Sequence, residues 1–442
     1  MTILLRNAHL VDPETNLDAT GSVLIDGEKI AAVTADAAQA SADRVVDCTG
    51  LIVSPGWIDM HVHLRVPGQE YKETIATGTA AAAAGGFTAV ACMPNTEPAL
   101  DSVETLRRLA EICDREAIVP VHPIGAITIG RAGQTVVDFD ALAEAGVVGF
   151  SDDGISTANA RLMVEALRAS ARLHLPVMVH CEDPTLVGGS MNDGEVSRRL
   201  GIAGIPAAAE EAFIARDCLL AAETGGWLHV LHVSTGRGLD LIRLARRWGA
   251  QITCEVMPHH LVMSDEWVAG SRRLHNTGER GPDAPARQSD TKVNPPLRTE
   301  RDTQLLLAGL VDGTFDILAT DHAPHADFEK HGTTIDKAMS GMIGLEVAVP
   351  TMFALVRAGH LTITNLVRRF ATEPARLWKL PYGSLTAGLP ANLTVIDPTA
   401  RWTVSPETIR SKSKNTPLMG MTMTGRAVMT FVDGKAVHDL VS

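Results

Sequence analysis

Short apolar runs alternate with amphipathic stretches between about residue 51 and residue 325. A short apolar run is typical of a buried strand, and apolar positions three or four residues apart are typical of a helix packed on one face. The expected strands are Leu51–Ile58, Phe87–Met93, Ile118–Ile127, Val147–Phe150, Pro176–Val179, Trp227–Leu231, Gln251–Val256 and Ile317–Ala319. The clearest helices between them are Val103–Asp114, Ala160–Leu173, Ala207–Glu223 and Gly238–Trp248. Eight strands alternating with helices predict an α/β protein with a parallel sheet.

The two ends of the chain follow a different pattern. Residues 2–50 alternate as short strands around turns, and the tail repeats this pattern at Asn392–Asp397 and Ala427–Val432. Neither end offers enough strands for a core of its own, so we expect both to combine into one small β-sandwich. The predicted division is 1–54 and 386–442 for the two halves of the sandwich and 55–385 for the α/β domain.

Charge and cysteine content narrow the class of protein. The formal net charge of -13 at pH 7 disfavours nucleic acid and anionic membranes as partners. The six cysteines include no CxxC pair, which is typical of reduced thiols. The N-terminal residues do not resemble a signal peptide, and the charge-free stretch Ile75–Thr96 is broken by Gly85-Gly86. We therefore expect a soluble, cytoplasmic protein that does not contact the membrane.

Most of the conspicuous histidines and aspartates directly follow an expected strand. His61, His63 and Arg65 follow the first strand and share one face, because alternate side chains of a strand point the same way. The later strand ends carry Asp153, His180, His232, Asp321 and His325. In a closed barrel the carboxyl ends of all strands meet at one rim. That convergence favours a closed (β/α)8 barrel of the TIM type over an open doubly wound sheet.

The types of these residues point to a metal site. Four histidines and two aspartates offer imidazole nitrogen and carboxylate oxygen, which are ligands that Zn2+ prefers. Six ligands exceed the need of one tetrahedral ion, but two ions about 3.5–4 Å apart that share a carboxylate would use them all. A single HxH motif occurs by chance in many folds. HxH combined with Asp, His, His and Asp at separate strand ends is a much more specific signal.

Several motifs together resemble a known family. They are His61-Val62-His63-Leu64-Arg65, Met93-Pro94-Asn95-Thr96, Phe150-Ser151-Asp152-Asp153-Gly154, His180-Cys181-Glu182-Asp183, Asn294-Pro295-Pro296-Leu297-Arg298 and Thr320-Asp321-His322-Ala323-Pro324-His325. In combination, over nearly the whole chain, they resemble dihydroorotase of the bacterial class I type in the amidohydrolase superfamily. The resemblance implies reversible hydrolysis of the cyclic amide of (S)-dihydroorotate to N-carbamoyl-L-aspartate in pyrimidine (UMP) biosynthesis.

The resemblance also implies a role for each matching position. The metal ligands would be His61, His63 and Asp321 for one Zn2+, His180 and His232 for a second, and Asp153 as the bridge. Many relatives use a carboxylated lysine as the bridge, but no lysine stands at the end of the fourth strand here. Asp152 is then expected to cap a loop. Asp321 would act as general acid and base beside a metal-activated hydroxide.

The substrate carries a carboxylate, which the family binds with residues that match Arg65, Asn95 and His325. Asn294 matches a residue that contacts the ring, and Gly341 matches a position that offers backbone contacts from a loop. Three features depart from the family pattern: Val66, Ser340 and the long stretch His275–Lys292. These departures fall on the substrate loop and its surroundings, not on the metal site. The conformation of residues 326–344 is not predicted.

Other polar residues are interpreted as structural. Cys181 lies beside His180, but adjacent strand residues face opposite ways, so we expect a buried thiol rather than a nucleophile. Glu255, His259 and His260 match no ligand position and are expected to be structural. Asp101 and Glu73 are expected to cap or solvate helix starts.

Two alternative functions stay open at this point. One is another cyclic amidase of the superfamily, namely a hydantoinase, dihydropyrimidinase or allantoinase; these usually carry the carboxylated lysine. The other is a non-catalytic structural partner of aspartate transcarbamoylase, which predicts eroded ligands. We also expect a homo-oligomer, and the resemblance allows association with aspartate transcarbamoylase. The sequence fixes neither the oligomeric state nor the number and identity of the bound metals.

Overall fold

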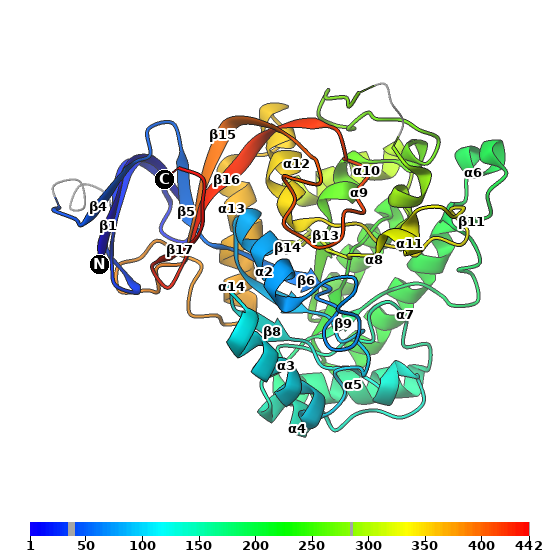
Figure 1. Ribbon diagram of the computed structural model, residues 1–442. Coiled ribbons are helices and arrows are strands. Elements are labelled where there is room, and N and C mark those ends of the chain that lie inside the picture. The colour runs from blue at the N-terminus through cyan, green and yellow to red at the C-terminus, as the bar shows by residue number, and fades with distance from the viewer. Residues whose placement is uncertain (34–39, 283–285, 442) are drawn as a thin grey trace.

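The structure is a computed structural model that describes residues 1–33, 40–282 and 286–441. Part of the stretch His275–Lys292, residues 283–285, therefore lies outside the described residues. In Figure 1 a sheet formed by the two ends of the chain lies to the left of a larger barrel, and both termini are on that side. None of the helices in the described chain combines the length and hydropathy needed to cross a bilayer.

The larger part of the chain forms a closed barrel of parallel strands. Its strands are β6 (Trp57–Val62), β7 (Phe87–Cys92), β8 (Val121–Pro123), β9 (Val177–Val179), β12 (Leu228–Val230), β13 (Ile252–Val256) and β14 (Ile317–Leu318). β6, β7 and β8 form one hydrogen-bonded group, and β9, β12, β13 and β14 form another. Phe150 bridges Gly125 on one side and Val177 on the other, and so occupies the place of the fourth strand. A bridge between Val62 and His322 closes the ring, as expected from the sequence.

The barrel strands are joined through helices on the outside of the barrel. The longer ones are α2 (Ile75–Ala84), α3 (Val103–Glu116), α5 (Ala160–Leu173), α7 (Ala207–Thr224), α8 (Gly236–Arg247), α10 (Glu300–Val311) and α12 (Leu345–Arg357). Several begin at a side chain that accepts a hydrogen bond from the first turn, such as Thr74, Ser102 and Thr299. Shorter helical segments are α4 (Phe139–Glu144), α6 (Glu195–Leu200), α9 (Pro258–Val262), α11 (Asp327–Lys330), α13 (Ile363–Val367) and α14 (Glu373–Leu377).

Strands from both ends of the chain form one sheet. Its order is β17-β16-β15-β5-β1-β2-β3, with β4 paired to β1. The N-terminal strands are β1 (Thr2–Asp12), β2 (Leu17–Asp26), β3 (Lys29–Val33), β4 (Arg44–Asp47) and β5 (Ile52–Pro55), and the C-terminal ones are β15 (Leu393–Thr403), β16 (Thr422–Val432) and β17 (Lys435–Asp439). β15 joins the two sets by pairing antiparallel with β5. The sheet encloses its own cluster of buried side chains, including Leu5, Val23 and Phe431. The remaining short strands, β10 (Met191–Asn192) and β11 (Gly204–Ile205), pair with each other.

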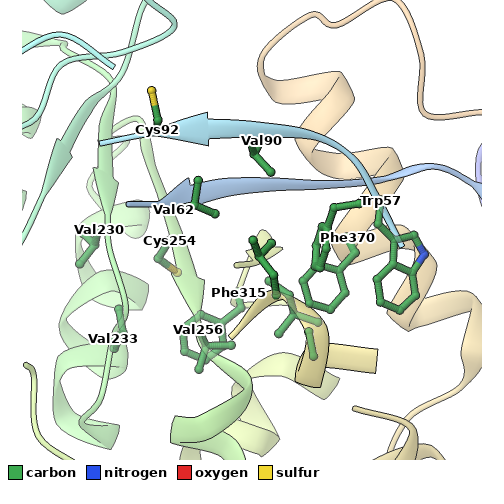
Figure 2. Packing of buried hydrophobic residues seen from close by; sticks show 14 of the residues in the cluster. Trp57, Val62, Val90, Cys92, Val230, Val233, Cys254, Val256, Phe315 and Phe370 are labelled. Atoms are coloured by element: carbon green, nitrogen blue, oxygen red, sulfur yellow. The ribbon is translucent and has the colours of Figure 1, made fainter. Parts of the chain in front are cut away.

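Aromatic side chains pack the start of the first barrel strands against a helical segment outside them, Arg368–Thr372. The Trp57 ring stacks on Phe370 with centroids 4.8 Å apart and meets Phe87 edge-on at 6.0 Å. Figure 2 shows this packing beside Val62, Phe315 and the neighbouring strands. The start of β6 is therefore fixed by aromatic packing, whereas its carboxyl end carries His61.

The bounds of several expected strands shift, as where Ile118–Ile127 shortens to β8, and two further predictions differ more strongly from the structure. The expected strand Leu51–Ile58 is divided at Gly56 into β5, which belongs to the terminal sheet, and β6, which belongs to the barrel. The expected strand Val147–Phe150 forms only the two bridges at Phe150. The apolar pattern predicted burial correctly in both cases, but burial alone does not specify which sheet a segment joins.

Candidate metal centre

All six candidate ligands converge on the carboxyl-terminal rim of the barrel. His61 lies in β6 and His63 follows it; His180, His232 and Asp321 follow β9, β12 and β14. Asp153 lies three residues after Phe150, at the fourth strand position. All six side chains are buried.

The two carboxylate oxygens of Asp153 face different pairs of histidines. Its Oδ2 lies 3.8 Å from His61 Nε2 and 3.5 Å from His63 Nε2. Its Oδ1 lies 3.5 Å from His180 Nδ1 and 3.6 Å from His232 Nε2, and these two nitrogens are 3.0 Å apart. Asp321 Oδ1 stands on the first side, 3.5 Å from His61 Nε2 and 2.9 Å from His63 Nε2. This arrangement is suited to two cations that share Asp153.

The electrostatics of the cluster favour positive charge. Burial opposes ionisation, yet the neighbouring histidines hold the pKa of Asp153 well below its usual range and also lower that of Asp321. Burial likewise opposes protonation of His180, but Asp153 and Glu182 raise its pKa to about 10. Carboxylates that stay ionised in a buried pocket need compensating cations.

The donor atoms themselves fit metal ions. His61 Nε2 and Asp153 Oδ1 are buried and have no hydrogen-bond partner among the described residues. Buried polar atoms without partners are rare and call for a ligand. Two groups, His61–Asp153–His232 and His61–His63–Asp321, bring one ligand atom from each residue within 4.8 Å of one another. Imidazole and carboxylate together match the preference of Zn2+.

Three residues of this rim have an unusual backbone conformation. Arg65, His232 and Asp321 have φ values of 62°, 34° and 48°. A positive φ is uncommon outside glycine, and such residues cluster at functional sites where surrounding structure holds them.

Two carboxylates and an amide orient the ligand histidines by contacting the ring nitrogens that face away from Asp153. Glu255 Oε1 accepts a hydrogen bond from His61 Nδ1 at 2.6 Å, and Glu182 Oε2 lies 2.9 Å from His180 Nε2. Asn95 Oδ1 lies 2.8 Å from His63 Nδ1. From the sequence, Glu255 is expected to be structural and Glu182 has no expected role. The sequence did contain a signal for Glu255, namely an acidic residue within a buried strand that has no other charged residue.

Other residues near the ligands have the structural roles expected from the sequence, except for Asp101 and Glu73. Asp152 accepts the backbone N–H groups of Ile127 and Thr128. Cys181 is buried. Asp101 does not cap a helix but accepts the backbone N–H of Gly130.

Glu73 also differs from expectation. It is fully buried and accepts hydrogen bonds from the Ser411 hydroxyl and, at 3.0 Å, from the Lys412 backbone. Glu73 does stand at the start of α2, where it also accepts the Thr77 hydroxyl, but it is not solvated. Its contacts with a segment more than 300 positions away cannot be predicted from local pattern.

A cavity of about 530 Å³ opens beside the metal ligands. Its lining includes all five candidate substrate residues, Arg65, Asn95, Asn294, His325 and Gly341. Arg65 and His325 lie together, with Nη2 and Nε2 3.3 Å apart. His325 Nε2 also donates to the Ser340 carbonyl at 2.9 Å, so its position depends on the loop.

Gly341 lies where the chain packs tightly. A Cβ there would lie 2.7 Å from Ala323 Cβ, and its φ is 137°. Its N–H donates to the Lys292 carbonyl at 2.8 Å, and its carbonyl accepts from Lys330 Nζ at 2.9 Å. Both backbone groups expected to contact substrate are thus engaged within the protein.

Comparison with known proteins finds close relatives over the whole chain. A model of the dihydro-orotase-like family matches residues 50–237. Proteins named dihydroorotase from Geotalea daltonii and Aquifex aeolicus are 42% and 40% identical to this chain, over 99% of it and 99% of each relative.

Solved structures show the same architecture. The L-hydantoinase (dihydropyrimidinase) from Arthrobacter aurescens has a TM-score of 0.85 at 26% identity and covers 99% of this chain and 96% of its own. A D-hydantoinase (dihydropyrimidinase) from Thermus sp. has a TM-score of 0.81 at 23% identity, covering 100% of this chain and 96% of its own, which supports the fold alone.

Proposed function

The chain belongs to the dihydroorotase family, and we propose that its six converging ligands hold two Zn2+ ions for that family's reaction. It is a hydrolase of cyclic amides. The reaction is the reversible hydrolysis of (S)-dihydroorotate to N-carbamoyl-L-aspartate in pyrimidine biosynthesis. The observation that carries the two-metal proposal is the division of Asp153 between two pairs of histidines.

His61, His63 and Asp321 would hold one ion, His180 and His232 the other, and Asp153 both. When bound, the ions would lower the pKa of water and polarise the scissile carbonyl. Asp321, whose carboxylate stays ionised because the neighbouring histidines lower its pKa, would accept a proton from the water that attacks the carbonyl. It would then deliver that proton to the ring nitrogen as the amide bond breaks.

The remaining residues would bind and orient the substrate. Arg65 presents a guanidinium, which is suited to a carboxylate, with His325 beside it and Asn95 in the same cavity. Asn294 would contact the ring, and Gly341 would keep the loop close to it. Assembly into a homo-oligomer, or with an aspartate transcarbamoylase, stays a prediction from the family resemblance.

The function is tested by assay of the purified protein with dihydroorotate, hydantoin and allantoin, before and after chelation. We expect turnover of dihydroorotate, its loss on chelation, and recovery with Zn2+. Preference for hydantoin or allantoin would instead support another cyclic amidase, and absence of turnover with a full metal content would support a non-catalytic protein.

The ligand assignment has its own test. Asp153→Ala should abolish turnover and lower the metal content, because both ions would lose a shared ligand. The matched control is Asp114→Ala, an exposed aspartate on α3. Full turnover in Asp153→Ala would refute the bridge.

A further inference from the structure

A second guanidinium, that of Arg131, lines the cavity near Arg65. Arg131 ends the short turn Ile129–Arg131 after β8, and it borders the same space as Asn95, Asp153 and Gly154. Three successive barrel strands, β6, β7 and β8, are thus followed by Arg65, Asn95 and Arg131. The family resemblance gave Arg131 no role.

Arg131 is anchored by one nitrogen and keeps its other donors uncommitted. Its Nη2 donates to the Asp153 carbonyl at 2.6 Å and to the Asp152 carbonyl at 3.3 Å. Its Nε is buried without a partner, and Nη1 forms no hydrogen bond within the described chain. A guanidinium has five N–H donors, and leaving buried donors unpaired is unfavourable. The spare donors therefore point to an acceptor from outside the protein.

The turn that carries Arg131 is held in a conformation that costs free energy. Arg131 has a φ of 55°. Asp152 fixes the turn from one side by accepting the Thr128 hydroxyl at 2.6 Å as well as two backbone N–H groups. Asp101 fixes it from another by accepting Gly130 N–H at 2.7 Å. Two buried or partly buried carboxylates thus present this guanidinium in one place.

Glycine at position 154 keeps space open between Arg131 and Asn95. A Cβ on Gly154 would lie 3.2 Å from Asn95 Nδ2 and 3.3 Å from Arg131 Nη2, so both side chains border one point. Asn95 uses its Oδ1 toward His63 Nδ1, and its Nδ2 has no hydrogen bond within the described chain. Arg131 Nη2 is committed to the backbone, and the unpaired donors on these two side chains are Asn95 Nδ2 and Arg131 Nη1. Unpaired donors on side chains that border one open space are suited to an oxygen anion.

We propose that Arg131 is a substrate-binding residue, which with Arg65 and the Asn95 amide binds the carboxylate of dihydroorotate. The proposal rests on the proposed function and adds a second guanidinium to it. Two guanidinium groups would select a ring that carries a carboxylate against the uncharged rings of other cyclic amidases. A competing explanation is that Arg131 only steadies the backbone of Asp153.

The test separates binding from support of the metal ligand. In Arg131→Met we expect the KM for dihydroorotate to rise 10- to 100-fold. The Kd of orotate, which keeps the carboxylate on an unsaturated, conjugated ring and serves as a non-reacting analogue, should rise by the same factor. Metal content should stay at the unmodified level and kcat within about threefold. Arg131→Lys, which keeps the charge but not the fork, should give intermediate values.

The control is Arg107→Met, an exposed arginine on α3, which should change none of these values. An unchanged Kd for orotate in both Arg131 variants would overturn the proposal, as would a loss of metal and kcat with KM unaltered. Failure of the unmodified protein to turn over dihydroorotate would refute the proposed function instead. If Arg131→Met does not fold, Arg131→Lys and its orotate Kd decide.

Discussion

At the scale of single residues, the orientation of the metal-ligating histidines depends on hydrogen bonds with residues that do not themselves face the metal site. Glu255 comes from β13, two strands from β6, yet its Oε1 accepts from His61 Nδ1 at 2.6 Å and from the His232 backbone N–H at 3.3 Å. Its Oε2 lies 3.2 Å from His229 Nε2. Burial opposes its ionisation, but His61 and His229 lower its pKa to about 2. The charged carboxylate therefore fixes which nitrogen of His61 faces the centre.

Glu255→Gln should weaken metal binding while the fold is kept. The amide has nearly the same shape, but it lacks the charge that orients His61, and loss of such a partner typically costs 10- to 100-fold in metal affinity. Competition with a chelator of known affinity measures the change. Glu223→Gln, an exposed residue of α7, serves as control. Equal metal affinity in Glu255→Gln and the unmodified protein would show that the His61 orientation is set by something else.

Sequence pattern predicts the candidate ligands better than it predicts their partners. His61 and His63 form a spaced pair, and the other ligands stand directly after apolar runs, so the barrel geometry is enough to bring them together. Glu255 and Arg131 carry no comparable signal. Their roles depend on which side chains meet across the barrel and on the conformation of turns. Tertiary packing determines both, and the order of residues along the chain does not reveal them.

At the scale of elements, Gly56 lies between the two sheets of the protein. It separates β5 of the terminal sheet from β6 of the barrel, and its N–H donates to the Asn392 carbonyl at 2.8 Å. A Cβ at this position would lie 2.2 Å from Thr88 Oγ1 and 2.3 Å from Thr88 Cγ2. The close approach of β7 therefore requires glycine here.

Gly56→Ala should lower the free energy of unfolding by about 1–3 kcal/mol, because the added methyl overpacks the junction. Denaturant unfolding monitored by circular dichroism measures it. Adding Thr88→Ala removes the two nearest atoms and should recover part of the loss. Gly188→Ala is the control, because no atom lies within 4 Å of its Cβ position. A stability of Gly56→Ala equal to that of this control would exclude the steric argument.

Helices were easier to predict than strands for a physical reason. The helix Ala160–Leu173 has the predicted bounds, since a long amphipathic repeat ends where caps and polar residues interrupt it. The barrel strands are buried on both faces and have no alternation to mark their ends. The sequence pattern therefore predicted β5 and β6 as one strand and predicted a longer fourth strand than the structure contains.

At the scale of the whole molecule, the C-terminal part of the chain reaches the active-site loop. The segment before β16 places Asn415, which is buried, against residues that follow β14. Its Oδ1 accepts the His325 backbone N–H at 3.0 Å. Its Nδ2 donates to the carbonyls of Ala323 at 3.0 Å and Gly341 at 3.1 Å. The same side chain thus links the two candidate substrate residues His325 and Gly341, although neither is near it in sequence.

Asn415→Ala should therefore impair substrate binding more than metal binding. Without the amide, the His325 N–H and the Ala323 carbonyl lose their partner and the Gly341 carbonyl keeps only Lys330 Nζ, so the loop that places His325 becomes less ordered. We expect the KM for dihydroorotate to rise by about tenfold or more, since each 1.4 kcal/mol of lost binding free energy is a factor of ten, while the metal content stays constant. Asn365→Ala, an exposed residue of α13, is the matched control. If Asn415→Ala instead lost metal in proportion to activity, the C-terminal segment would support the metal centre rather than the substrate loop.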